Sequence, residues 1–505
     1  MSNSGAIANN SNAAAAAEGQ PNVEIILTRV LSALLLGLCL SACSLAPEFT
    51  SPELAVPAAY KQQPAAQLTA TDAGNAEWKP AAPEDGEPRG AWWTRFDDPL
   101  LNDYQQRAAA ANQDLAAAVA RLEASRALVR VARAAQLPRL DAGAGAARTR
   151  PSANQPGIPF RIDPYNRFQI GVTAQYELDL FGRVRDSVRA TRADAQADEA
   201  LFQALLLAVE TDVAQTYFLL RALDAELAVL HDTVTTRKSE LTVFEQRFAA
   251  GDISALDVER ARTDLETARS DVQAVTRQRA QYEHALALLL GQAPAELDVA
   301  AAALATNLPD IPTGLPSALL ERRPDIAAAQ RRMIAANARI GVARAAFYPI
   351  LNLTAEAGFT ADSAGDLFKW ASRTWALGPL AGALVAAPLF DGGRNKANLA
   401  RAEAELDAEV ATYRQTVLNA FREVEDQLVA LRTLGEQSIA VASANHSAGR
   451  ALALANTRFQ AGASAYLDVL EARRSVIAVQ RQRKQLDGAR AQATVALIKA
   501  LGGGW

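Results

Sequence analysis

The sequence has few of the side chains on which most enzyme active sites depend. It contains two cysteines and three histidines in 505 residues, and His231, His284 and His446 lie far apart on helix-like segments. No glycine-rich phosphate loop follows a strand-like segment, and no group of residues has the spacing of a metal site. The sequence therefore offers no support for a catalytic function, and we expect no cofactor and no metal ion.

The scarcity of cysteine also excludes a disulfide from the mature protein. Cys39 lies in the apolar stretch Val30 to Leu40, which has signal-peptide length and is shorter than the roughly 20 apolar residues of a spanning helix. Leu40-Ser41-Ala42-Cys43 resembles a bacterial lipobox, in which the cysteine thiol takes a diacylglycerol and the new N-terminus an acyl chain. We expect residues 1–42 to be removed and Cys43 to be lipidated. The alternative is an ordinary signal peptide with an incidental cysteine.

The residue after Cys43 and the net charge indicate where the protein is located and which partners it does not bind. Ser44, rather than an aspartate, follows the cysteine, which in bacterial lipoproteins resembles an outer-membrane address. The net charge of −5 is not that of a nucleic-acid-binding protein. Residues 43–90 are rich in proline, alanine and glutamine, and they indicate an extended lead between the lipid anchor and the folded body.

The body of the chain is one unit repeated. A shift of 211 residues aligns the sequence with itself without a gap, and non-alanine residues match at one offset. The matches include Asp114/Asp325, Pro138/Pro349, Gly182/Gly393, Arg247/Arg458, Phe248/Phe459, Gly251/Gly462 and Asp257/Asp468. This period is far longer than that of solenoid repeats. The sequence predicts two tandem pseudo-symmetric repeats, 91–311 and 312–505.

Each repeat contains a pair of predicted strands. Arg167 to Leu180 alternates strictly between polar and apolar residues for 14 positions, longer than an ordinary soluble strand, with aromatics near both ends of its apolar face. This pattern is typical of a transmembrane β-strand, although a soluble two-sided hairpin remains the alternative. We predict strands at about 137–149, 167–181, 350–360 and 377–390, with the loop Pro151 to Pro164 between the first two. Four strands cannot close a barrel, so chains must share one, with eight strands in a dimer or twelve in a trimer.

Very long helices follow the strands. The apolar residues from Leu205 to Phe248 keep the 4-3 spacing of a coiled coil, and a helix of this repeat would be about 100 Å long. We predict helices at about 184–249, 254–290, 394–459 and 464–501, with a leading helix in each repeat, Trp92 to Gln136 and Pro324 to Phe347. Gly251 and Gly462 predict tight helix–helix turns.

Several motifs together resemble the TolC-like outer-membrane factors, in particular the lipidated OprM/NodT branch. They are Trp92-Trp93, Phe96 to Leu100, Tyr176 to Gly182, Leu315-Pro316-Ser317, Glu321 to Ile326, Pro388 to Arg394 and the two Arg-Phe…Gly…Asp-Val tips. The resemblance implies a homotrimer with a 12-stranded barrel in the outer membrane and an α-helical tunnel crossing the periplasm. It implies an exit duct for small molecules or drugs that works with a periplasmic adaptor and an inner-membrane pump, often of the RND type.

Two sets of residues at the tips are candidate functional sites. Asp468 and Glu471 lie three apart on one helix face, and the resemblance places an acidic gate there, with Asp257 as the first-repeat equivalent. Stabilisation of the helix N-terminus is the alternative for Asp468 and Glu471. It is favoured over an acidic ring at Asp257, because Arg260 stands three residues on instead of an acid. Arg247, Phe248, Gly251, Arg458, Phe459 and Gly462 are the candidate adaptor-docking residues, and helix capping by the glycines is compatible with that role.

Two other functions fit the same sequence. One is the outer-membrane duct of a type I protein secretion system, which the lipobox disfavours. The other is a periplasmic coiled-coil scaffold lipoprotein without a channel, which the 14-residue alternation disfavours.

Overall fold

The computed structural model describes residues 44–54, 56–62, 90–150, 152, 163–304, 308–312, 314, 316–378 and 383–503. The expected signal peptide, Cys43 and most of the loop 151–164 lie outside these ranges. Within them, no helix combines the length and the apolar character needed to cross a membrane. The chain divides into two compact units, each made of segments from both repeats.

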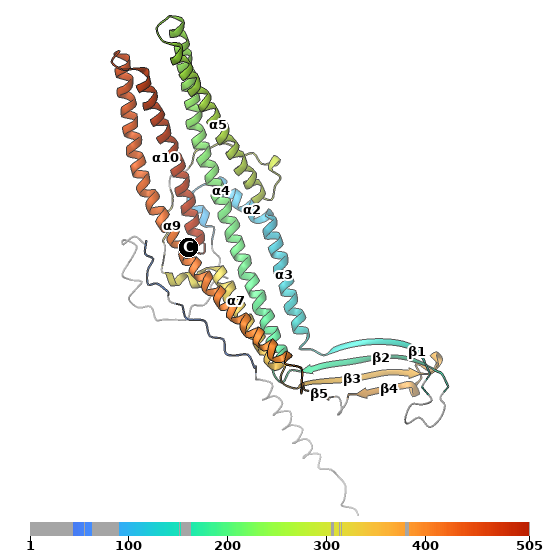
Figure 1. Ribbon diagram of the computed structural model, residues 1–505. Coiled ribbons are helices and arrows are strands. Elements are labelled where there is room, and N and C mark those ends of the chain that lie inside the picture. Colours follow the sequence, from blue (N-terminus) through green and yellow to red (C-terminus); the bar gives the residue numbers. More distant parts are fainter. Residues whose placement is uncertain are drawn as a thin grey trace, which may run out of the picture. The chain divides into compact units, whose positions relative to one another are not determined.

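The first unit holds the sheet and comprises the described residues within 44–48, 130–190 and 337–403. Its strands are β1 (Arg139–Thr149), β2 (Tyr165–Leu178), β3 (Ile350–Ala361), β4 (Arg373–Leu377) and β5 (Ala383–Ala386). All pairings are antiparallel, in the order β1-β2-β3-β4, and β5 also pairs with β3 (Figure 1). The two repeats therefore join through β2 and β3. Among the described strands, β1 has a partner on one side only.

The fourth strand differs from its prediction. The expected strand at 377–390 is replaced by β4 and β5, which begin at Arg373 and end at Ala386, and residues 379–382 between them lie outside the described ranges. Polar and apolar residues alternate poorly from Leu377 to Phe390, so the sequence pattern did not define the ends of this strand well. Pro388 lacks a backbone donor and lies just beyond the end of β5.

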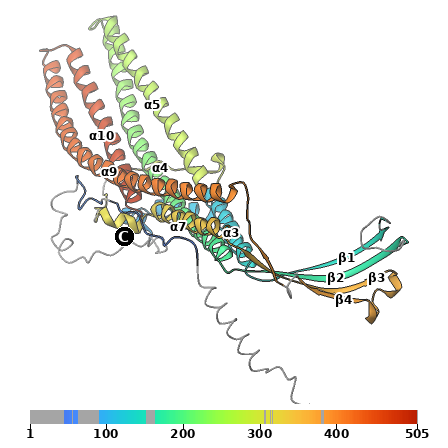
Figure 2. The ribbon, with the colours of Figure 1, turned by 60° about the horizontal axis from the view of Figure 1, so that its bottom comes forward.

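The second unit holds the long helices and comprises residues 49–129, 191–336 and 404–503 of the described chain. Its two hairpins are α4 (Arg183–Ala249) with α5 (Ala255–Leu289), and α9 (Arg394–Gln460) with α10 (Tyr466–Ala500). The first residues of α4 and α9 belong to the first unit. Each hairpin has one helix of 67 residues and one of 35, so the duplication is visible in the element lengths. Figure 2 shows the same elements from a second direction.

The leading helix of the first repeat is not continuous, contrary to the prediction. It consists of a 3-10 turn (Trp92–Phe96), α2 (Pro99–Ala111) and α3 (Gln113–Ala134). Asn112 leaves the helical conformation, and its side-chain oxygen accepts the amides of Asp114 and Leu115 at 2.9 and 3.1 Å. This is a helix N-cap, which begins a new helix. In the second repeat α7 (Pro324–Ala345) is the counterpart of α3, and Arg323, 211 residues after Asn112, also leaves the helical conformation.

A buried apolar cluster in the second unit holds both hairpins to the shorter helices. It includes Phe96, Phe218, Leu286 and Leu497, which come from four different elements. Its members are spread over both repeats, so the two repeats share this core. Arg323 is also buried, and its guanidinium donates to Glu423 at 2.8 Å and to the Ala500 carbonyl at 2.9 Å. The end of α10 is therefore fixed to the start of the second repeat.

Candidate channel mouth at the helical tips

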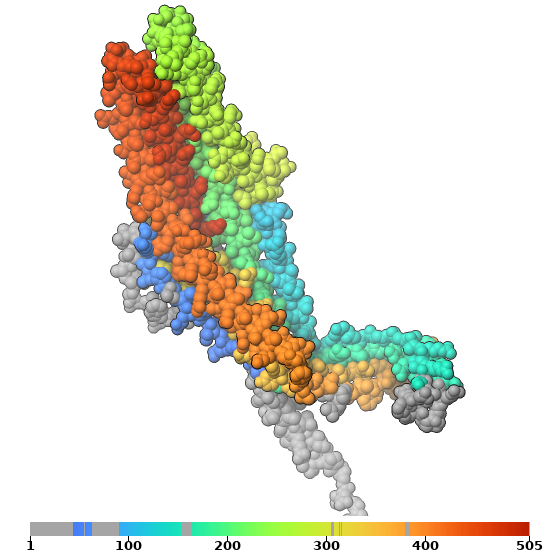
Figure 3. Space-filling view, viewed as in Figure 1, coloured from blue at the N-terminus to red at the C-terminus, as the bar shows by residue number. Residues whose placement is uncertain are grey.

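Both hairpins turn through a glycine in the left-handed region. Gly251 has φ +81° and Gly462 has φ +71°, a conformation that favours glycine. The Gly251 amide donates to the Phe248 carbonyl at 2.9 Å, and the Asp252 amide to the Arg247 carbonyl at 2.9 Å. Gly462 and Ala463 repeat the pattern at 2.9 and 2.8 Å. A Cβ on either glycine would meet open space, so the φ angle and not crowding selects glycine here. Figure 3 shows the α4/α5 tip in green and the α9/α10 tip in orange.

Some of the predicted docking residues contact one another across the two hairpins. The Arg247 guanidinium lies 5.9 Å from the centre of the Phe459 ring, within cation–π range. Phe459 packs edge-on against Tyr466, which packs edge-on against Phe244 at 4.4 Å between centroids. These rings join the end of α4 to the start of α10. Phe248, by contrast, is about half exposed.

The remaining tip residues differ in their surroundings. Arg458 is exposed and donates to the Ala463 carbonyl at 3.5 Å, within its own hairpin turn. It therefore remains available on the surface of the second tip. The docking set divides into Arg247 and Phe459, which join the hairpins, and Phe248 and Arg458, which face outward.

The three candidate gate acids also differ. Asp257 belongs to a capping box with Ser254 and lies 3.9 Å from Arg260, so it stabilises the start of α5. Asp468 and Glu471 are exposed in the first two turns of α10. Among the described residues, neither has a side-chain hydrogen bond or an ion pair. The structure thus separates the first-repeat acid, which caps a helix, from the second-repeat pair, which faces solvent.

The sequence reasoning missed a set of ion pairs that connects the hairpins behind the tips. Arg474 of α10 pairs with Asp264 of α5, and Arg473 of α10 pairs with Glu240 of α4. The Asp264 carboxylate, which is 8% exposed, also lies 3.5 Å from Arg237. Burial lowers the pKa of the Arg237 and Arg473 guanidinium groups. Closely spaced buried cations and anions of this kind are costly to separate.

A second ion-pair cluster lies farther from the tips. Arg481 of α10 donates to Glu226 of α4 at 2.9 and 3.1 Å and to Asp271 of α5 at 3.0 Å. Gln485 donates to the same Glu226 carboxylate at 3.1 and 3.2 Å. Glu226 is buried, so its charge is balanced within the protein rather than by water. Both clusters link α10 to the first hairpin.

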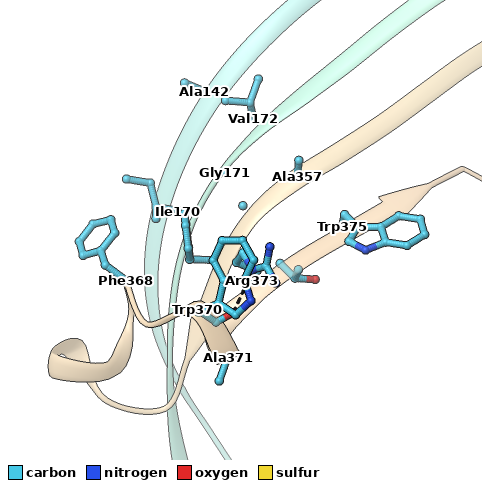
Figure 4. Close-up of a pocket in the computed structure, with 13 residues that line it drawn as sticks. Ala142, Ile170, Gly171, Val172, Ala357, Phe368, Trp370, Ala371, Arg373 and Trp375 are labelled. Carbon is cyan, nitrogen blue, oxygen red and sulfur yellow. Dashed lines mark hydrogen bonds between the residues drawn. The ribbon is translucent and has the colours of Figure 1, made fainter.

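The far end of the sheet, in the first unit, carries aromatic side chains. A cavity of about 920 Å³ lies on the apolar face of β2 and β3, and the β3–β4 connection contributes Phe368, Trp370 and Ala371 to its wall. Figure 4 shows Trp370 beside Arg373, with Phe368 and Trp375 farther to either side. The Arg373 guanidinium lies over the Trp370 ring, and its Nε donates to the Trp370 carbonyl at 3.0 Å. Aromatic rings at the rim of an apolar strand surface are typical of outer-membrane strands.

An antiparallel sheet with an apolar outer face and two very long helical hairpins define the class of outer-membrane channel proteins with an α-helical extension. Comparison with known proteins identifies the family. The model of the outer membrane efflux protein family matches residues 105–292 and again 315–503, one match for each repeat. The chain belongs to this family, and it is an outer membrane efflux protein.

Individual relatives agree over nearly the whole chain. The solvent efflux pump outer membrane protein SrpC of Pseudomonas putida is 37% identical over 472 residues, which cover 93% of this chain and 97% of that protein. OprJ of Pseudomonas aeruginosa is 37% identical, covering 94% and 96%. Among solved structures, the outer-membrane channel OprN matches with a TM-score of 0.81 at 30% identity, covering 92% of this chain and all of that one. The Campylobacter jejuni CmeC channel matches with a TM-score of 0.82 at 27% identity, covering 92% and 95%.

Proposed function

We propose that three copies of this chain assemble into one channel that works with a periplasmic adaptor and an inner-membrane pump of the RND type. The observation that carries the proposal is the sheet of the first unit, in which β1 has a free edge among the described strands. A free strand edge is not tolerated in lipid, so neighbouring copies must pair with it. β4 and β5 both pair with β3, at successive positions along it, and so count as one strand of the sheet. Each chain then supplies four strands, and three copies would close a 12-stranded barrel and would bring six hairpin tips to one mouth, to which the adaptor would bind.

The proposed partners can be tested in cells. Chemical crosslinking followed by affinity purification of this chain should co-isolate one adaptor and one pump, and light scattering of the detergent-extracted protein should give three chains per particle. A monomer or dimer in detergent, together with an absence of both partners after crosslinking, would contradict the proposal. An adaptor paired with an ATP-driven protein exporter would instead support the type I secretion alternative.

We propose small organic molecules as the transported class. Relatives that are 37% identical to this chain are named for solvent and toluene efflux. The role is passive conduction, without catalysis and without a cofactor. A deletion strain should become sensitive to organic solvents and regain tolerance when this chain is restored. Unchanged tolerance in both strains would contradict the substrate class.

Three site proposals complete this function. Cys43 would carry the lipid anchor, which mass measurement of the N-terminal peptide would detect. Asp468 and Glu471 would form an acidic ring at the mouth, because their exposed carboxylates would be repeated three times around the axis. Phe248 and Arg458 are the surface residues of the tips that would contact the adaptor. Cysteines placed at these two positions should give disulfide crosslinks with cysteines on the adaptor.

A further inference from the structure

The residues directly after Cys43 contact the start of α4 and the end of α7, all within the first unit, and the space that they fill beside Gly341 is called the groove below. The Ser44 hydroxyl lies 2.8 and 2.9 Å from the two carboxylate oxygens of Asp186, to which it donates. The Asn337 side-chain amide donates to the Pro47 carbonyl at 2.8 Å, and Arg344 donates to the Leu45 carbonyl at 3.5 Å. Residues 44–47, called the arm below, are therefore held by contacts to both helices.

Asp186 is the centre of this groove. Its side chain is 0% exposed, and burial raises the pKa of its carboxyl while the Ser44 hydrogen bond opposes that rise. Arg189 lies 3.4 Å away but is more than half exposed. A buried carboxylate needs hydrogen-bond donors, and the arm supplies one. The Ala46 amide donates to the Ser44 oxygen at 3.2 Å and so holds the hydroxyl in place.

The groove exists because α7 has no side chain at Gly341. A Cβ at this position would lie 2.3 Å from the Asp186 carboxylate and 2.8 Å from Ala46, so any other residue would displace the arm. The two repeats differ at these positions. The residues 211 positions away from Asp186, Asn337 and Gly341 are Ala397, Arg126 and Arg130. The second set provides neither the acceptor nor the space, so the groove has no counterpart at the repeat-related positions.

We propose that Asp186, Asn337 and Gly341 form a receptor site for the chain's own arm, one that selects a small hydroxyl side chain at position 44. The site fixes the point at which the N-terminal end leaves the folded body. An aspartate at position 44 would bring a second carboxylate against Asp186, and like charges this close oppose each other's ionisation. Repulsion from Asp186 in the folded protein thus disfavours an acidic residue next to Cys43, independently of any role of this position as an outer-membrane address. Only the statement that this end carries lipid rests on the proposed function.

Hydrogen–deuterium exchange of the mature protein in detergent tests the site. Asp186→Ala leaves the arm sequence intact, and we expect it to accelerate exchange at the Leu45, Ala46 and Glu48 amides about tenfold, the size expected for losing a hydrogen bond to a charged group. Ser44→Ala should act similarly, and the double variant should show little further change. Gln330→Ala is the matched control, because Gln330 donates to Ser51 at 3.3 Å outside the groove. It should leave these amides unchanged.

Two outcomes would overturn the site. One is unchanged exchange of the arm in Asp186→Ala, and the other is full additivity of the two single variants. Exchange at β2 (Tyr165–Leu178) shows in the same samples whether each variant is folded. If Asp186→Ala does not fold, Ser44→Ala still tests the site, because it changes only the arm. The mass of the N-terminal peptide reports acylation separately. If the N-terminal peptide is not acylated but the arm is protected from exchange, the lipid anchor is contradicted and the site is not. If the peptide is acylated but the arm is unprotected, only the site is contradicted.

Discussion

Arg474 of α10 pairs with Asp264 of α5, and the two residues belong to different repeats. The positions equivalent to them are Thr263 and Ser475, which carry no charge. Arg481 and Glu226 show the same division, with Ser270 and Gln437 as their equivalents. The second hairpin supplies the cations and the first supplies the anions. The duplicated hairpins have thus become complementary in charge where they meet within one chain.

Removing one partner of this joint should loosen the paired hairpins. Arg474→Ala leaves the buried Asp264 carboxylate with only the more distant Arg237, and we expect a loss of about 1–3 kcal/mol, reduced from the value for a fully buried pair because Arg474 is half exposed. Thermal unfolding of the purified protein measures the loss. The exchanged variant Asp264→Arg with Arg474→Asp should recover part of it. A double variant no more stable than the single ones would contradict a specific pair.

Asn112, the cap that divides the leading helix of the first repeat, should contribute to the stability of the fold. Its oxygen accepts two amides of α3, and its side-chain amide donates to the Leu289 carbonyl at 2.9 Å, at the end of α5. Asn112→Ala removes all three bonds, and we expect about 1–2 kcal/mol of destabilisation in chemical denaturation. Gln113→Ala, at the exposed neighbouring position, is the control and should have a much smaller effect.

Particular elements show how far the sequence could predict this structure. The alternation at Arg167 to Leu180 predicted β2 to within three residues at each end, because a strand with one apolar face and one polar face has a strict period of two. The Asn112 cap was missed, because alanine-rich sequence on both sides continued the helical pattern. The charged pairs between hairpins were also missed, since they join residues more than 200 positions apart. Comparing the repeats for opposite charge at facing positions could have indicated them.

Stability at alkaline pH should depend on Tyr217. Its hydroxyl donates to Asp98 at 2.5 Å, and burial, together with this hydrogen bond, raises the pKa of the phenol to about 12. The folded protein therefore holds this proton more tightly than the unfolded chain, and the stability it contributes is lost as pH rises from 10 towards 12. Tyr217→Phe should unfold at a lower temperature than the unmodified chain at pH 8. The difference should shrink above pH 10, and a constant difference would contradict the assignment.

The exposed acids of α10 predict how the channel responds to cations. In a trimer, Asp468 and Glu471 would place six carboxylates near the axis, and such a ring attracts multivalent cations. Asp468→Asn should weaken the block of single-channel current by these cations in planar bilayers, with little change in the melting temperature, because the side chain is exposed and has no partner among the described residues. Asp257→Asn is the matched control. Its carboxylate caps α5, so this variant should lower stability and leave the block unchanged. Equal block in the Asp468 variant and the unmodified channel would remove the acidic ring from the mouth, whereas a weaker block in the Asp257 variant would place the first repeat at the gate as well.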